Sequence, residues 1–153
     1  MNNKEIITKF YQSFAEGNAE EMVSCYHDEI EFQDPAFGKI KGDDAKNMWR
    51  MLLERGSSKI DFSNVTANET KGSANWRAEY DYGPKKRKVI NLVSAKFDFK
   101  DGKIIKHVDD FNMWKWSQQA LGLGGYLLGW TPIIKSKVQS TTNALLKKYS
   151  AQA

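Results

Sequence analysis

The alternation of apolar and polar residues over residues 59–112 constrains the fold more than any other feature of the sequence. Two long alternating runs, 76–82 and 89–99, are followed by a hairpin signal at Asp101-Gly102. Because successive side chains of a strand point to opposite faces, these runs predict consecutive antiparallel strands. The apolar side of the first run consists of Trp76, Ala78, Tyr80 and Tyr82.

Apolar residues at helical spacing precede this sheet. They predict three helices, over residues 3–16, 19–27 and 43–55. A short strand from Ile30 to Asp34 should end at Pro35, because proline cannot donate to a sheet. Helices followed by an antiparallel sheet make an α+β domain.

Composition limits the class of protein. A length of 153 residues gives one domain with one core. The single cysteine, Cys25, excludes an internal disulfide and a cysteine-rich zinc site. The two histidines, His27 and His107, lack a known ligand spacing, so no metal is expected. The first residues lack the apolar segment of a signal peptide, which predicts a cytoplasmic protein.

Charge is distributed unevenly along the chain. The net charge is +4, yet residues 113–153 hold five lysines and no acid, so residues 1–112 carry 18 basic against 19 acidic residues. A neutral body argues against a nucleic-acid partner. The basic run Lys85–Lys88 resembles a nuclear signal, but its place after Gly83-Pro84 favours a solvated turn.

The order of elements and several short motifs resemble the nuclear transport factor 2-like superfamily. The similarity covers about residues 4–124 and is greatest to its SnoaL-like polyketide cyclases, which are related to ketosteroid isomerase. The motifs are Gly17-Asn18 between two helices, residues 30–35 followed by Gly38 and Gly42, and residues 107–112 leading into 116–122.

This resemblance implies a curved antiparallel sheet wrapped around a helix, which forms a cone-shaped barrel with an internal apolar pocket. We expect a cone domain over residues 1–124 and a C-terminal helical extension over residues 125–153. The family also implies a lipophilic small molecule as ligand and a homodimer. The fold hosts isomerases, cyclases, hydrolases and binding proteins, so it does not define the activity.

Strand alternation predicts which side chains face such a pocket. On the long strand the face with Asn91 should be the inner one, because Lys96 and Asp98 occupy the other. The inner face of the last strand should carry Ile105, His107, Asp109 and Phe111. Ionisable groups on an inner face cost free energy unless they are paired or functional.

Asp34 is the first candidate catalytic residue. By similarity to ketosteroid isomerase, the Asp of this Asp-Pro motif is the general base that moves a proton beside a carbonyl group. An apolar cavity would raise its pKa and make it a better base near neutral pH. The alternative is that Asp34 only caps the turn before Pro35.

His107 and Asp109 form the second candidate pair. The resemblance to SnoaL-like cyclases implies that a carboxylate and a histidine relay protons to and from a carbon acid. The alternative is a structural histidine that bonds Asp109 or Asn91 and holds the strands together. The acid usual after Phe111 in this motif is replaced by Asn112, which should point outward.

The oxyanion donors of ketosteroid isomerase are missing. Its tyrosine and protonated aspartate correspond to Phe10 and Ala95 here, and Tyr11 is rotated by about 100° around the helix from Phe10. The chain is therefore not expected to be a ketosteroid isomerase. Asn91 is expected to donate a hydrogen bond to the ligand. The predicted aromatic ligand contacts are Tyr26, Trp49, Trp76, Tyr80, Phe10 and Phe111. Aromatic residues at these spacings also suit a plain hydrophobic core.

The C-terminal region has its own pattern. Residues 116–134 lack charge but contain glycines and Pro132, which argues against a membrane-spanning helix. An amphipathic helix flanked by lysines is expected after Pro132. It could cover the mouth of the cone, pack on its own domain or a partner subunit, or lie on an anionic membrane.

Two functions remain open from the sequence. The first is a SnoaL-like small-molecule protein with cofactor-free isomerase, cyclase or hydratase chemistry, in which Asp34 is the base, His107 and Asp109 relay protons, and Asn91 donates a hydrogen bond. The second is a non-catalytic ligand carrier or interaction module of the same fold.

Overall fold

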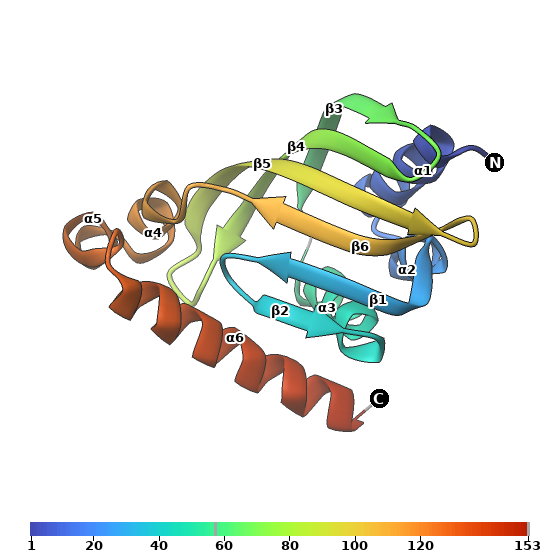
Figure 1. Cartoon of the computed structure of the whole chain (residues 1–153). Coiled ribbons are helices and arrows are strands. Elements are labelled where there is room, and N and C mark those ends of the chain that lie inside the picture. Colours follow the sequence, from blue (N-terminus) through green and yellow to red (C-terminus); the bar gives the residue numbers. More distant parts are fainter. Residues whose placement is uncertain (57, 153) are drawn as a thin grey trace.

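The chain forms a curved six-stranded sheet with helices against its concave side and at one end (Figure 1). The computed structural model describes residues 1–56 and 58–152. The helices are α1 (Asn3–Ala15), α2 (Ala19–Ser24), α3 (Asp43–Arg55), α4 (Met113–Leu121), α5 (Leu123–Leu128) and α6 (Pro132–Gln152). The strands are β1 (Tyr26–Asp34), β2 (Gly38–Lys41), β3 (Lys59–Ala67), β4 (Lys71–Tyr82), β5 (Arg87–Lys100) and β6 (Lys103–Asp110).

The strand order explains the shape of the sheet. The order is β2-β1-β6-β5-β4-β3, and β3 to β6 form the antiparallel succession that the sequence predicts. The exception to the antiparallel prediction is the pair β1–β6, which is parallel. Since β2 and β3 end the strand order, the sheet forms an open cone and not a closed barrel.

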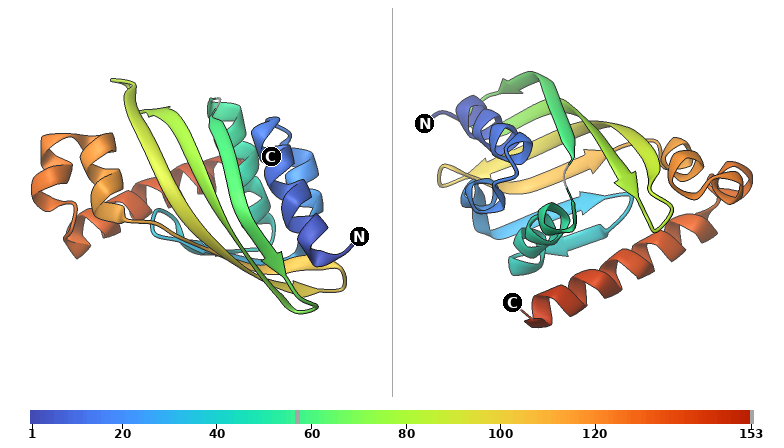
Figure 2. Two further views of the ribbon diagram at one scale, coloured as in Figure 1. Left: turned by 90° about the horizontal axis from the view of Figure 1, so that it is seen from above. Right: turned by 180° about the vertical axis from the view of Figure 1, so that it is seen from behind.

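The concave face is filled by α1 and α3, as Figure 2 shows. A capping box begins α1, because Asn2 accepts from the amide of Glu5 and the Glu5 carboxylate accepts from the amide of Asn2. The buried apolar face of α1 consists of Ile6, Ile7, Phe10, Tyr11 and Phe14. That of α3 consists of Ala45, Met48, Trp49 and Met51.

The predicted helix over residues 19–27 is too long. The helix ends at Ser24, Cys25 caps it, and Tyr26 begins β1. The carbonyl of Cys25 accepts a hydrogen bond of 2.9 Å from the amide of Ile104, so sheet pairing draws the chain out of the helix at this point. The short strand β2 pairs with β1 and was also absent from the prediction.

The inner face of β5 is the predicted one, since Val89, Val93, Ala95 and Phe97 are buried and Lys96 is exposed. On β6 the prediction is correct for His107 and Asp109 but wrong for Ile105. The β5–β6 register shifts between Asp98 and Phe99, so Ile104 is fully buried in place of Ile105.

The C-terminal region is helical, as expected. Residues before the first glycine of this region form α4, the glycine-containing segment forms α5, and the predicted helix after Pro132 is present as α6. The expected domain boundary at residue 124 falls inside α5. Helix α6 packs beside α3 on its own chain, where Asn47 contacts Ser150 and Glu54 accepts from the hydroxyl of Tyr149 (Figure 1).

Candidate functional site

A chain of buried hydrogen bonds crosses the interior between α3 and β6. The indole Nε1 of Trp49 donates to the Tyr26 hydroxyl at 2.8 Å, and this hydroxyl lies 2.7 Å from Nδ1 of His107. The Nε2 atom of His107 lies 2.8 Å from Oδ1 of Asp109. Trp76 donates to the same oxygen at 3.3 Å. Residues from α3, β1, β4 and β6 thus meet at His107.

The donors in this chain define its direction. An indole N–H only donates, so the Tyr26 oxygen accepts from Trp49. The Asp109 carboxylate only accepts, which places the proton of a neutral His107 ring on Nε2 and leaves Nδ1 to accept from the Tyr26 hydroxyl. Nε2 of His107 then carries the ring proton and donates it to the Asp109 carboxylate. Both ring nitrogens of His107 are therefore used within the protein.

Several aromatic rings pack around His107. Phe97, Phe32 and Phe10 lie with ring centroids 4.5, 5.1 and 5.5 Å from the imidazole. His107 has no exposed surface. A buried histidine bonded to Asp109 is the geometry that the structural alternative predicts for His107.

Asp109 still has hydrogen-bonding capacity. Both His107 and Trp76 contact its Oδ1, which leaves Oδ2 for another partner. The hydroxyl of Tyr11 is also buried and lacks a hydrogen-bond partner among the described residues. Burial raises the pKa of Tyr11 well above its ordinary value, and the nearby Asp109 charge adds to this. Although Tyr11 is rotated around the helix from Phe10, its hydroxyl is buried without a partner and its electrostatic surroundings include Asp109.

Asp34 lies at the end of β1, where it both caps a turn and carries an unusual protonation equilibrium. Its Oδ1 accepts from the amides of Ala36 and Phe37 at 2.9 and 2.6 Å, as the turn interpretation predicts. Burial raises the pKa of Asp34 to about 7, and the Asp109 charge adds to the rise against the lowering effect of the two amides. The carboxyl group is therefore partly ionised near neutral pH.

Helix α6 holds the turn that carries Asp34. The side chains of Gln139, Thr142 and Asn143 donate to three consecutive carbonyl oxygens at 3.0, 2.6 and 2.8 Å. These carbonyls belong to Pro35, Ala36 and Phe37. Nothing in the sequence pattern pointed to this contact, because the partners are 104 to 106 residues apart.

The other predicted ligand contacts fall into two groups. Phe10, Tyr26 and Trp49 are almost completely buried behind His107. Trp76, Tyr80, Asn91 and Phe111 are half-buried. The Tyr80 hydroxyl accepts from Trp116 at 2.8 Å, and burial is the main cause of its raised pKa, with a smaller effect from Asp34.

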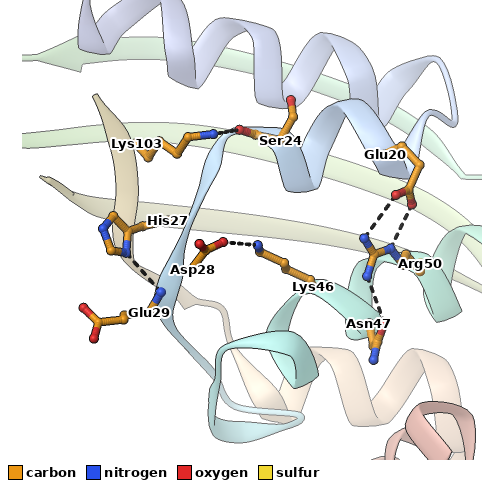
Figure 3. A network of polar contacts seen from close by, with 9 residues as sticks. All are labelled: Glu20, Ser24, His27, Asp28, Glu29, Lys46, Asn47, Arg50 and Lys103. Carbon is orange, nitrogen blue, oxygen red and sulfur yellow. Dashed lines mark hydrogen bonds and ion pairs between the residues drawn. The ribbon is translucent and has the colours of Figure 1, made fainter. Parts of the chain in front are cut away.

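Asn112 is exposed, as predicted, and caps α4 by accepting from the amide of Lys115 at 3.0 Å. The replacement of the usual acid at this position thus has a structural role. His27 is separate from His107, and its Nδ1 accepts from the amide of Glu29 on the same strand (Figure 3). Nearby, Lys46 joins α3 to Asp28 of β1, and Arg50 joins α3 to Glu20 of α2. Within the described part of the chain, no group of three or more His, Cys, Asp or Glu side chains is placed to hold a metal ion.

Two open hollows of the surface lie away from these residues. One lies at the β3–β4 turn and is lined by Thr66, Ala67, Asn68, Lys71, Gly72 and Ser73, and the other is lined by residues between Met1 and Gln12 at the start of α1. Neither contains a predicted site residue. The internal pocket therefore stays a prediction. The homodimer and the cytoplasmic location stay predictions as well.

The open cone formed by the six-stranded sheet and the helices on its concave face is the fold that the comparisons address. A family model described as SnoaL-like domain matches residues 7–107. The chain belongs to the SnoaL-like family. Comparison with curated proteins finds no match.

Solved structures confirm the fold of this SnoaL-like chain. TerC co-crystallised with polyporic acid is 14% identical, has a TM-score of 0.65, and the match covers 75% of this chain and 95% of TerC. A putative polyketide cyclase from Pseudomonas putida is 14% identical with a TM-score of 0.65, and the match covers 78% of this chain and 98% of the cyclase. An NTF2-like protein from Cytophaga hutchinsonii is 17% identical with a TM-score of 0.59, and the match covers 71% of this chain and 98% of that protein.

The nuclear transport factor 2-like assignment is thus confirmed, and at these identities the structural similarity establishes the fold alone. Helices α4 to α6 lie beyond the SnoaL-like match, which ends at residue 107. The helix that holds the Asp34 turn is therefore contributed from outside the matched family domain.

Proposed function

We propose that this SnoaL-like protein binds a lipophilic carbonyl compound and transfers a proton within it, with Asp34 as the base and without a cofactor. The observation that carries the proposal is the placement of the Asp34 carboxyl group, which is half-buried at the end of β1 with its Oδ1 held by the amides of Ala36 and Phe37. Burial raises its pKa to about 7. A base works best when its pKa lies near the working pH, because it is then both ionised and able to accept a proton. Isomerisation, cyclisation and hydration all use such a step.

The neighbouring polar groups have distinct roles in this proposal. Asp109 faces the ligand with its Oδ2 and relays the proton together with His107, which is in turn oriented by Tyr26. Tyr11 and Asn91 donate to the carbonyl oxygen, where negative charge develops. The unpartnered hydroxyl of Tyr11 supports this role, because a buried hydroxyl without a partner is costly unless a ligand uses it.

The half-buried aromatic residues Trp76, Tyr80 and Phe111 form the ligand-facing wall, whereas Phe10, Tyr26 and Trp49 support it from behind. The solved neighbours support an organic ligand. They include putative polyketide cyclases and TerC, which was co-crystallised with polyporic acid.

A non-catalytic carrier of the same fold is the second candidate. The observation in its favour is that the His107 hydrogen bonds are complete within the protein, as a structural network requires. Phe10 and Ala95 also stand where the isomerase has its oxyanion donors. In a carrier, Asp34 and Asp109 would orient the ligand and no proton would be exchanged.

Proton exchange separates the two candidates. A panel of lipophilic β-diketones and β,γ-unsaturated ketones is incubated with the protein in deuterated water, and deuterium at carbon is measured by mass spectrometry. Tryptophan fluorescence reports binding in parallel. The control variant is Asp110→Asn, since Asp110 neighbours Asp109 but is exposed.

We expect the wild type and Asp110→Asn to exchange, and Asp34→Asn to bind the same ketone with exchange slowed by about 100-fold or more. Undiminished exchange in Asp34→Asn would remove Asp34 from its role. Binding by the wild type without any exchange above the uncatalysed rate would favour the carrier.

A further inference from the structure

Helix α5 has its small residues inside and its large apolar residues outside. Among its residues the buried one is Gly125. Gly129, which caps the helix, is also buried. The large apolar side chains around them are 54% to 76% exposed, and they are Leu123, Tyr126, Leu127, Leu128, Trp130 and Ile133. We call these six residues the apolar tip. An ordinary surface helix shows the opposite arrangement.

Close backbone packing fixes this arrangement. A Cβ atom on Gly125 would overlap the carbonyl group of Ser117 on α4, and one on Gly129 would overlap the carbonyl of Gly125 and the Ser117 side chain. The inward face of α5 therefore has no room for a larger residue. The leucines and aromatic residues cannot turn inward by a small rotation of the helix, so their exposure is built into the fold.

A tip of this kind needs a partner. Soluble monomers rarely expose contiguous apolar patches of more than a few hundred Å², and larger ones mark interaction sites. Residues 116–134, which include the whole tip, contain no charged side chain. Figures 1 and 2 show α5 at one end of the molecule, away from α1 to α3, so it can reach a partner without disturbing the cone.

The charges beside the tip indicate which partner it is. Lys115 precedes the uncharged segment, Lys135 and Lys137 follow it, and all three are exposed. Residues 113–153 contain no acid. Arg87, the first residue of β5, lies against α4 as well, since its side chain donates to the carbonyl of Gln119 at 2.8 Å. The side chains named here are all positive, and they complement an anionic surface.

The aromatic residues favour the same partner. Trp114, Tyr126 and Trp130 are exposed, and the indole N–H groups of both tryptophans donate to backbone carbonyls at 2.9 and 3.1 Å. Their polar atoms are thus satisfied while their rings are free to contact an apolar phase. Tryptophan and tyrosine are enriched where a bilayer meets water, and lysine can reach the headgroups beside them.

We propose that the apolar tip inserts into the headgroup region of an anionic lipid bilayer and anchors the protein peripherally. Over residues 1–56 and 58–152, no helix is long and apolar enough to cross a membrane, so insertion is shallow. Binding combines burial of the tip with attraction of the lysines to anionic headgroups. The proposal does not depend on the activity proposed for Asp34.

Vesicle sedimentation tests this directly. Wild-type protein is mixed with phosphatidylcholine vesicles that contain about 30% phosphatidylserine, and separately with pure phosphatidylcholine vesicles. The tip variant combines Leu127→Ser with Trp130→Ser, and the charge variant combines Lys135→Glu with Lys137→Glu. The control is Leu52→Ser, which removes an exposed leucine of α3 at a distance from α5 (Figure 1). Circular dichroism checks that each variant keeps its fold.

We expect the wild type and Leu52→Ser to partition at least about tenfold more strongly onto the anionic vesicles than onto the neutral ones. The tip variant and the charge variant should each lose about tenfold or more of this partitioning. Absence of wild-type binding, or binding that the tip variant retains, would overturn the proposal. A concentration-dependent dimer that the tip variant abolishes, without vesicle binding, would assign the tip to contact between copies and also overturn it.

Discussion

The Nε2 atom of His107 lies 2.8 Å from Oδ1 of Asp109, and neither side chain has more than 2% of its surface exposed. Tyr26 and Trp49 continue this contact on the other side of the imidazole. The interior of the cone is therefore organised by a polar chain inside an aromatic core. Such a chain is stabilising when every member has a partner and costly when one is lost.

Replacing His107 should expose that cost. In His107→Phe the ring volume is largely kept, but Asp109 loses its donor and Tyr26 loses its acceptor. We expect a loss of about 3 kcal/mol or more in the free energy of unfolding, measured by urea denaturation. His27→Gln, at a half-buried histidine outside this hydrogen-bond chain, should change it by less than about 1 kcal/mol. Equal stability of His107→Phe and wild type would show that the chain is not structural.

Tyr26→Phe isolates one hydroxyl. Its removal leaves the indole N–H of Trp49 and Nδ1 of His107 without their partner, so we expect a loss of about 1–3 kcal/mol in unfolding free energy. The matched control is Tyr126→Phe, because Tyr126 is 56% exposed. If both variants lost the same small amount, the hydroxyl would have no special role in the core.

Asp34→Asn should stabilise the protein in a pH-dependent way. The pKa of Asp34 is raised from an ordinary 3.8 to about 7, so folding favours the protonated form. The favourable contribution is complete below the unfolded pKa and is lost as the pH rises through the folded one. The amide stays neutral and still accepts from Ala36 and Phe37, so it avoids this loss.

We therefore expect Asp34→Asn to match the wild type in thermal stability near pH 4 and to exceed it near pH 8, by as much as about 4 kcal/mol. Thermal unfolding at a series of pH values, with Asp110→Asn as control, measures the difference. A stability difference that is independent of pH would contradict the raised pKa.

Helix α6 should stabilise the Asp34 turn through its polar side chains. Asn143→Ala and Thr142→Val each remove a donor to a carbonyl of that turn, so each should cost about 1 kcal/mol and together slow ketone exchange. Thr141→Val is the control, since Thr141 is exposed and bonds only within α6. Hydrogen exchange of the Phe37 amide reports the turn itself. An equal effect of Thr141→Val would show that helix propensity, not the turn contact, is responsible.

Short-range sequence patterns predict much of the fold, in particular the faces of the strands and the positions of the turns. Alternation placed His107, Asp109 and Asn91 on the inner side of the sheet, and the Asp-Pro pair marked Asp34, because both signals lie within a few residues of the chain. The turn at Asp101-Gly102 was equally local, and both residues have the positive φ that this hairpin needs.

Long-range partners could not be predicted in this way. Tyr26 and His107 are 81 residues apart, and their contact depends on β1 pairing in parallel with β6. The predicted end of α2 is wrong for the same reason. Apolar residues at helical spacing continue through Cys25, but the Cys25 carbonyl accepts from the amide of Ile104 and the chain enters β1 there. The inverted face of α5 could not be predicted either, because it depends on close packing of Gly125 and Gly129 on Ser117 of another helix.

The protonation of Asp34 tests the account most directly. Carbon-13 NMR of aspartate-labelled protein follows each side-chain carboxyl group through a pH titration, and Asp34→Asn identifies the Asp34 signal by its absence. We predict one aspartate with a midpoint near pH 7 that disappears in the variant. If the Asp34 signal titrated at about pH 4, like an exposed aspartate, the proposed base would be an ordinary turn cap and the central claim would be wrong.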